Sequence, residues 1–132
     1  MPIGETNLDL LLRTMQPVLH PDEYVFCTLP PGQPVPPQLA PVATFGEAEG
    51  QTLIVARAAA DHAGLPWIYP CRWLTLNVHS SLEAVGFLAR ITSHLAAHGI
   101  SVNPVSAYYH DHLFVPAERT GEVLRLLDQL RG

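Results

Sequence analysis

The sequence predicts an α+β fold in which two related halves each combine short strands with helices. Three observations support this prediction. Apolar residues recur at helical spacing in some segments, alternate with polar residues in others, and a short apolar pattern repeats after 60 residues. The chain has 132 residues, enough for one compact domain or two small ones that share a core.

The first half opens with apolar residues at helical spacing, and Pro17 closes this helix. An aromatic and β-branched segment then favours a strand. The predicted elements are a helix at 6–15, capped by Thr6 or Asn7, a strand at 23–29, strands at 42–47 and 51–55 turned at Glu49-Gly50, and a helix at 56–62 followed by Gly64. Between them lies PPGQPVPPQLAP, residues 30–41, whose prolines remove backbone donors and predict a loop. The alternative is a recognition segment for a proline-binding partner.

The second half begins with an extended stretch at 67–78, in which Leu74, Leu76 and Val78 alternate with polar or aromatic residues. Ser80-Ser-Leu-Glu83 has the spacing of a capping box and predicts the start of a helix that ends at Gly99. Strands at 101–109 and 112–115 and a helix at 118–130 complete the half. The inward residues are expected to be Ala84, Leu88, Ile91 and Leu95 in the first helix and Val123, Leu124, Leu127 and Leu130 in the second.

The two halves can be overlaid. QTLIV at 51–55 matches DHLFV at 111–115, an offset of 60, whereas the earlier helices match at an offset of 76. The difference, 76 − 60 = 16, is roughly the size of an inserted proline-rich loop. Each half approximates a ferredoxin-like βαββαβ unit. We therefore expect two repeats, residues 1–70 with the loop at 30–41 and residues 71–132, with antiparallel sheets and helices on one face.

The composition disfavours several classes of function. The formal net charge is −5, and the seven cationic residues are all arginines scattered along the chain, so neither a nucleic-acid nor an anionic-membrane partner is expected. No apolar run approaches the roughly 20 residues that cross a bilayer. The first residues, MPIGE, lack the features of a signal peptide, so a cytoplasmic location is expected. Cys27 and Cys71 stand in apolar segments and read as buried hydrophobes.

One segment, GFLARITSHLAAHGISV at residues 86–102, resembles the signature of ACT domains. The usual Asp-x-Pro-Gly loop of that family is replaced here by the longer segment at residues 79–86. The whole chain, from GETNLDLLL through CRWLTLNVHSSLEAVG to YYHDHLFVP, is similar to a small bacterial tandem-ACT family. The resemblance implies a regulatory protein that binds an amino acid or a related small effector, is not itself an enzyme and needs no cofactor.

The loop before the predicted helix suits an anion such as an α-carboxylate, because helix N-termini present free N–H groups and a positive dipole end. His79 and the two serines add donors, and Gly86 allows close backbone approach. The alternative is that Ser80 and Glu83 simply cap the helix. With the resemblance, the expected ligand-binding residues are His79, Ser80, Ser81, Val85, Gly86, Phe87, Asn103 and Val105, with residues 103–106 near a bound amino group.

The most conspicuous polar motif is His110-Asp111-His112, which is either a turn or half of a metal site. Residues two apart in a strand point to one side, but a structural zinc needs about four ligands, and neither the i,i+4 pair His94 and His98 nor any other histidine completes the set. We expect a turn with Asp111 bonded to backbone, no metal and no catalytic motif. Glu47, Glu49 and Arg72 are read as solvated or strand-flanking residues, with contact to a charged ligand as the alternative.

Three functional hypotheses follow. The first is a ligand-binding sensor that regulates a partner enzyme and forms a homo-oligomer. The second is a ligand-free interaction or dimerisation module, and the third is a small metal-dependent enzyme. The sequence leaves the ligand, the regulated partner and the oligomeric state open.

Overall fold

The computed structural model describes residues 4–132 and confirms the α+β fold. The strand pairs β1–β3, β2–β3 and β5–β6 are antiparallel, as predicted. In chain order the elements are α1 (Leu8–Thr14), β1 (Pro17–Leu29), a 3₁₀ turn (Pro37–Leu39), β2 (Ala43–Gly46), β3 (Gln51–Ala56), α2 (Arg57–Ala63), β4 (Ile68–Leu76), α3 (Phe87–Ala96), β5 (Asn103–Ser106), β6 (Asp111–Pro116), a second 3₁₀ turn (Ala117–Arg119) and α4 (Thr120–Leu130).

The chain forms two compact units. Among the described residues, unit 1 consists of residues 4–20 and 72–132, and unit 2 consists of residues 21–71. Strands β1 and β4 are divided between them, so the strand order is β1-β4-β6-β5 in unit 1 and β2-β3-β1-β4 in unit 2. The expected division of the chain at residue 70 follows sequence order and stays a prediction.

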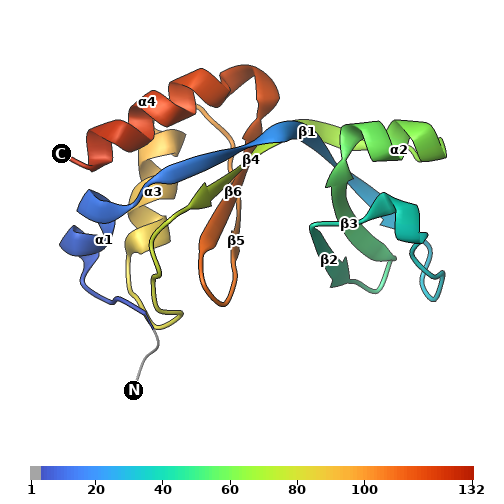
Figure 1. The fold of residues 1–132 in the computed structure, drawn as a ribbon, viewed down its shortest axis with the longest axis horizontal. Helices are drawn as coiled ribbons and strands as arrows, with labels where there is room; N and C mark the ends of the chain where they lie inside the picture. Colours follow the sequence, from blue (N-terminus) through green and yellow to red (C-terminus); the bar gives the residue numbers. More distant parts are fainter. Residues whose placement is uncertain (1–3) are drawn as a thin grey trace. The chain divides into compact units, whose positions relative to one another are not determined.

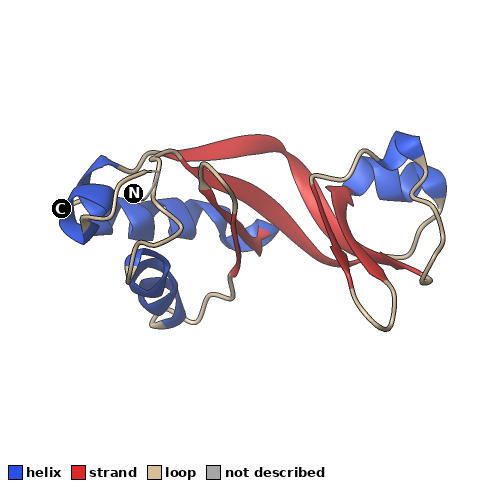
Figure 2. Cartoon of the chain, turned by 90° about the horizontal axis from the view of Figure 1, so that it is seen from below, coloured by secondary structure: helices blue, strands red, loops and turns tan. Residues whose placement is uncertain are grey.

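In unit 1, helices α1, α3 and α4 pack on one face of the strands (Figure 1, Figure 2). The core contains Leu11 and Leu12 of α1, Ile91 and Leu95 of α3, and Val123, Leu126 and Leu127 of α4, packed on Leu74 and Leu76 of β4 and Leu113 and Val115 of β6. Each fully buried aliphatic side chain contributes about 1.5–3 kcal/mol. The predicted inward positions Leu124 and Leu130 are only partly buried, and Leu126 takes a core position that was not predicted.

In unit 2 a single α-helix, α2, packs on the strands, and the proline-rich segment covers part of the same core. Leu39, in the 3₁₀ turn, is 2% exposed and packs with Val25, Leu53 and Val55. Val35 is partly buried against the same cluster. The predicted loop is confirmed, and two of its apolar side chains anchor it to the core.

Several local predictions are confirmed. Asn7 caps α1, its side-chain oxygen accepting from the N–H of Leu10 at 3.0 Å. Gly64 ends α2 in the left-handed conformation, with its N–H bonded to Ala60 and Asp61. The β2–β3 hairpin turns at residues 47–50, where a Cβ on Gly50 would lie 2.5 Å from the carbonyl oxygen of Leu29. Glycine is therefore required at this close approach of two strands.

The predicted capping box is wrong. Residues 80–86 form a loop, α3 begins at Phe87, and Ala84 lies outside the helix. The spacing of Ser80 and Glu83 fits the motif, but the Ser80 hydroxyl donates to the buried carboxylate of Asp111 instead. Ser81 accepts the N–H of Glu83 in a local turn. The Ser80 side chain is therefore directed at a tertiary acceptor, and the N–H of Glu83, which a capping box would bond to Ser80, bonds to Ser81.

Three strand boundaries also differ from prediction. β1 begins at Pro17 rather than at residue 23, since the fixed φ of proline is compatible with an extended chain even where the sequence suggests a break. β5 is shorter than the predicted 101–109, because residues 107–110 form a turn closed by the bond from the N–H of Ala107 to the carbonyl of His110. Asp111 thus begins β6 and is not part of the turn itself.

The internal repeat found in the sequence is also present in the structure. Leu53 and Val55 of β3 and Leu113 and Val115 of β6 are all fully buried, each pair facing the core of its own unit. Each strand leads into a helix, α2 or α4. The offset of 60 therefore relates structurally equivalent strand–helix pairs.

Candidate ligand-binding site

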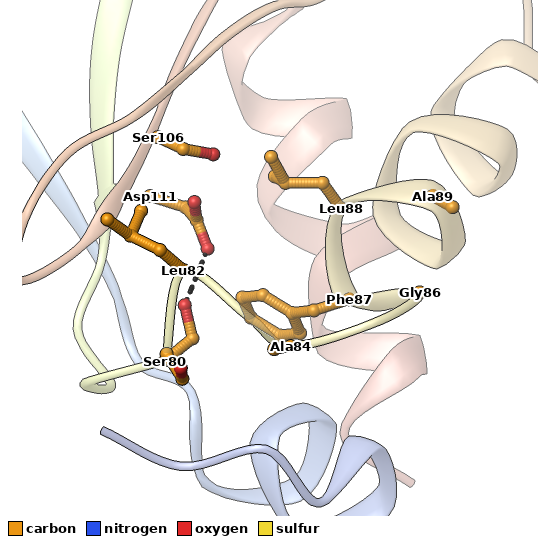
Figure 3. A pocket seen from close by; sticks show the side chains of 10 residues that line it. Ser80, Leu82, Ala84, Gly86, Phe87, Leu88, Ala89, Ser106 and Asp111 are labelled. Atoms are coloured by element: carbon orange, nitrogen blue, oxygen red, sulfur yellow. Dashed lines mark hydrogen bonds between the residues drawn. The ribbon is translucent and has the colours of Figure 1, made fainter. Parts of the chain in front are cut away.

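Unit 1 contains a cavity of about 140 Å³ between the loop at 80–86 and the first turn of α3 (Figure 3). Ser106, which ends β5, and Asp111, which begins β6, form its opposite wall. In Figure 3, Phe87 and Leu88 stand across the cavity from Asp111. The complete lining is Ser80, Ser81, Leu82, Ala84, Gly86, Phe87, Leu88, Ala89, Ser106 and Asp111.

The polar centre of the cavity is the pair Ser80 and Asp111, each 6% exposed. The Ser80 hydroxyl donates to Asp111 Oδ2 at 2.8 Å (Figure 3). Asp111 takes part in none of the ion pairs found among residues 4–132. A buried carboxylate is costly unless a cation or several donors compensate it. Asp111 therefore offers a site for a positively charged group that enters the cavity.

The N-terminus of α3 forms another part of the wall. Gly86 occupies the cap position with φ +92°, a left-handed conformation that favours glycine, and no side chain caps the helix. The first intrahelical bond runs from the N–H of Arg90 to the carbonyl of Gly86. The N–H groups of the first turn have no acceptor within the helix, and the dipole makes this end attractive to an anion. The residues of that turn, Phe87, Leu88 and Ala89, line the cavity.

The N-terminal segment positions the loop. Glu5 forms a parallel bridge with Ser80, in which its N–H donates to the carbonyl of His79 and its carbonyl accepts the N–H of Ser81, both at 2.8 Å. A Cβ on Gly4 would lie 2.9 Å from the backbone of both His79 and Ser81. These contacts hold residues 79–81 extended and aim the Ser80 side chain at Asp111.

Four of the eight predicted binding residues line this cavity: Ser80, Ser81, Gly86 and Phe87. The other four do not. His79 contacts the ring of Tyr109, Val85 is 85% exposed, Asn103 pairs with Phe114, and Val105 pairs with His112. Ser106, within the wider prediction of residues 103–106, does line it. Binding by these residues stays a prediction.

Asp111 was expected to bond to backbone in a turn, and this expectation is wrong because its side chain turns into the unit and accepts from Ser80. The sequence held a usable signal. Side chains alternate along a strand, so a residue two positions before the inward Leu113 and four before Val115 also points inward. A charged residue at such a position marks a candidate site.

The remaining histidines are engaged elsewhere. His112 bonds to Trp73 and Thr75 on the other face of β6, and His110 Nδ1 lies 3.4 Å from the carbonyl of Val78. His94 bonds to Gln129, and His98 bonds to the carbonyl of His94. In residues 4–132 no three His, Cys, Asp or Glu side chains are grouped so as to hold a metal ion.

The other charged and thiol candidates have structural contacts. Glu47 accepts from Thr52 within the β2–β3 hairpin, and Arg72 donates to the carbonyl of His20 at 2.9 Å. Both cysteines are free and buried, as predicted. Burial, followed by the charge of Glu23, raises the pKa of the Cys71 thiol to about 12. None of the helices in residues 4–132 is long and apolar enough to span a membrane.

Comparison with known proteins identifies the family to which the chain is similar. ACT-domain models match residues 3–72 and residues 68–129. A crystal structure of a Vibrio cholerae protein of unknown function, described as a possible transport protein, is 42% identical, covers 95% of this chain and 96% of that one, and superposes with a TM-score of 0.85. The comparison with curated proteins finds no match.

More distant structures share the fold alone. A protein from Agrobacterium tumefaciens is 15% identical over 89% of each chain, with a TM-score of 0.77. The ligand-free regulatory subunit of aspartate kinase from Thermus thermophilus is 14% identical, covers 90% of this chain and 97% of that one, and gives a TM-score of 0.65.

These matches define the class as an α+β protein of two ACT domains in tandem, with no catalytic domain identified in the matched residues. The chain belongs to the ACT-domain family.

Proposed function

We propose that this protein binds an amino acid, or a similar small zwitterion, in the cavity of unit 1 and acts as a regulatory sensor without catalysis of its own. The observation that carries the proposal is the buried Asp111 carboxylate, which has a hydroxyl partner but no cation and shares its cavity with the N-terminus of a helix. The Asp111 carboxylate favours a cation, and the helix N-terminus favours an anion. A zwitterion satisfies both.

In the proposed complex, the ligand ammonium group bonds to Asp111, and Ser80 keeps the carboxylate oriented. The ligand carboxylate bonds to the N–H groups at the start of α3, as anions do at helix N-termini. The ligand side chain lies against Phe87 and Leu88. Because the cavity volume of about 140 Å³ lies below the 300–1,000 Å³ of pockets for drug-sized molecules, we expect a small amino acid.

The family supports a regulatory role. ACT domains commonly bind amino acids, and the distant likeness in fold to the regulatory subunit of aspartate kinase supports the same kind of role here. We infer by this analogy that the ligand changes the affinity of the protein for an enzyme partner.

A thermal-shift screen of the standard amino acids at millimolar concentration tests the proposal, since a ligand that binds only the native state raises the melting temperature. We expect one group of small amino acids to give a shift, and the matching amine and carboxylic acid, each lacking one charge, to give none. The Asp111→Asn variant should lose the response. A screen in which folded wild-type protein responds to no amino acid would contradict the proposal.

The second candidate is a ligand-free interaction module. Phe45 and Ile68 of unit 2 are 72% and 71% exposed, and Ile68 borders an apolar groove of about 300 Å³ with Phe26, Pro66 and Trp67. Exposed apolar surface of this kind is typical of interaction sites. Under this hypothesis, Phe45→Ser and Ile68→Ser lower the mass measured by light scattering, whereas Asp111→Asn does not change it. A monomeric wild-type protein with a thermal response to amino acids would exclude it.

A further inference from the structure

The sheet face of unit 1 that points away from the helices carries a hydrogen-bonded cluster of His20 from β1, Trp73 and Thr75 from β4, and His112 from β6. These side chains alternate with the core residues of β4 and β6 and therefore lie on the opposite face. The His20 ring stacks on Trp73 with centroids 3.5 Å apart and an interplanar angle of 11°. Trp73 in turn stacks over Phe114, which is only 2% exposed.

The contacts of this cluster determine which atoms donate and which accept each hydrogen bond. An indole N–H only donates, so His112 Nδ1, 3.0 Å from Trp73 Nε1, must be an unprotonated acceptor. Thr75 Oγ1 lies 3.1 Å from the same nitrogen and must donate to it. Having given its one hydrogen to His112, the Thr75 hydroxyl accepts from His20 Nε2 at 2.8 Å. The cluster as a whole therefore requires neutral His112 with its hydrogen on Nε2.

We propose that this cluster is a proton-operated latch, in which neutral His112 holds the Trp73 indole over Phe114 and protonated His112 releases it. A proton on Nδ1 would point at two donors, the Trp73 N–H and the Thr75 hydroxyl, and both bonds would be lost. The hydroxyl can rotate, but the indole N–H cannot become an acceptor. Trp73 must then move, and the apolar surface of Phe114 becomes accessible.

The charged surroundings of His112 are consistent with this role. His20 approaches from β1, Arg72 lies on β4, β5 carries no titratable side chain, and His110 and Asp111 flank His112 on β6. Burial, then the charges of His110 and His20, lower the pKa of His112 from 6.5, and Asp111 opposes them. The latch is thus closed at neutral pH and opens only when the pH falls below the usual pKa of histidine. It does not depend on the proposed amino-acid ligand.

The test is an NMR titration of the full chain between pH 8 and pH 5, following the two indole N–H resonances and the imidazole protons of His112. The Trp73 resonance should move with the same midpoint as His112, below 6.5. Trp67, whose indole N–H donates to Asp61 at 2.8 Å in unit 2, is the internal control and should not move in this range. The latch is refuted if Trp73 keeps its position while His112 titrates, or if the two midpoints differ.

The His112→Asn variant supplies a matched control, because its Oδ1 stands where His112 Nδ1 stood and accepts from Trp73 at every pH. The Trp73 transition should disappear in this variant. If the transition persists, His20 titration is responsible and the proposal is wrong. Should the variant fail to fold, the comparison of the two midpoints in the wild-type protein still decides.

Discussion

Substitutions of Ser80 and Asp111 distinguish whether the buried Asp111 carboxylate stabilises the fold or serves ligand binding. In Ser80→Ala the carboxylate loses its one side-chain donor while remaining buried. A hydrogen bond to a charged group contributes about 1.5–3 kcal/mol, so the free energy of unfolding should fall by about that amount. In Asp111→Asn the amide oxygen still accepts from Ser80, and the cost of burying a charge disappears. We expect that variant to be as stable as the wild-type protein or more stable.

The assay is urea denaturation followed by circular dichroism at pH 7.5 without amino acids, with linear extrapolation to water. We therefore expect Ser80→Ala to lower the free energy of unfolding and Asp111→Asn to leave it unchanged or raise it. A residue that is retained for binding at the expense of stability is typical of functional sites. If Asp111→Asn lost more stability than Ser80→Ala, the carboxylate would have a structural role, and the argument for a ligand ammonium group would fail.

The remaining predictions concern pH, one glycine and one thiol. Burial lowers the pKa of His20 and His112 below 6.5, so the unfolded chain binds more protons than the folded chain in acid. The free energy of unfolding measured by urea denaturation should therefore fall as the pH drops from neutral through 6.5, and a rise over that range would contradict the assignment. Gly50→Ala should lower the free energy of unfolding by about 1–3 kcal/mol, because its Cβ would collide with the carbonyl oxygen of Leu29. Gly46→Ala, where a Cβ meets nothing within 4 Å, should change the free energy of unfolding little. Equal effects of the two substitutions in urea denaturation would contradict the steric requirement for glycine at position 50. The Cys71 thiol should stay unreactive toward a thiol reagent at pH 8 until the protein is unfolded, since its pKa is about 12, and fast native-state labelling would contradict its burial.

The sequence predicted most of the fold because its periodic patterns report packing directly. The matching apolar residues at 53–55 and 113–115 are buried in β3 and β6, and the offset of 60 relates the two strands. Asn7 and Gly64 act through local chemistry, which is readable without tertiary information. The association of residues 4–20 with 72–132 in one compact unit was not predicted, because local patterns do not report such long-range contacts.

The candidate site was predicted only in part, because its decisive contact is tertiary. Ser80 and Glu83 have the spacing of a capping box, and the sequence does not reveal that the Ser80 side chain turns to a carboxylate 31 residues away instead of to the local backbone N–H. The predicted loop lines the cavity of unit 1, but the contact between Ser80 and Asp111 was not predicted. Extending the strand alternation backward from Leu113 would have identified Asp111 as an inward charge.

The most direct test of the proposed function is isothermal titration calorimetry with the amino acid that gives the largest thermal shift, titrated into wild-type protein and into Asp111→Asn. If the ligand ammonium group bonds to Asp111, the wild-type protein should give a saturable signal. The variant should bind about tenfold to a hundredfold more weakly, which corresponds to the loss of about 1.5–3 kcal/mol for one charge-assisted bond. Equal affinity for both proteins would place the ligand elsewhere and contradict the proposed site.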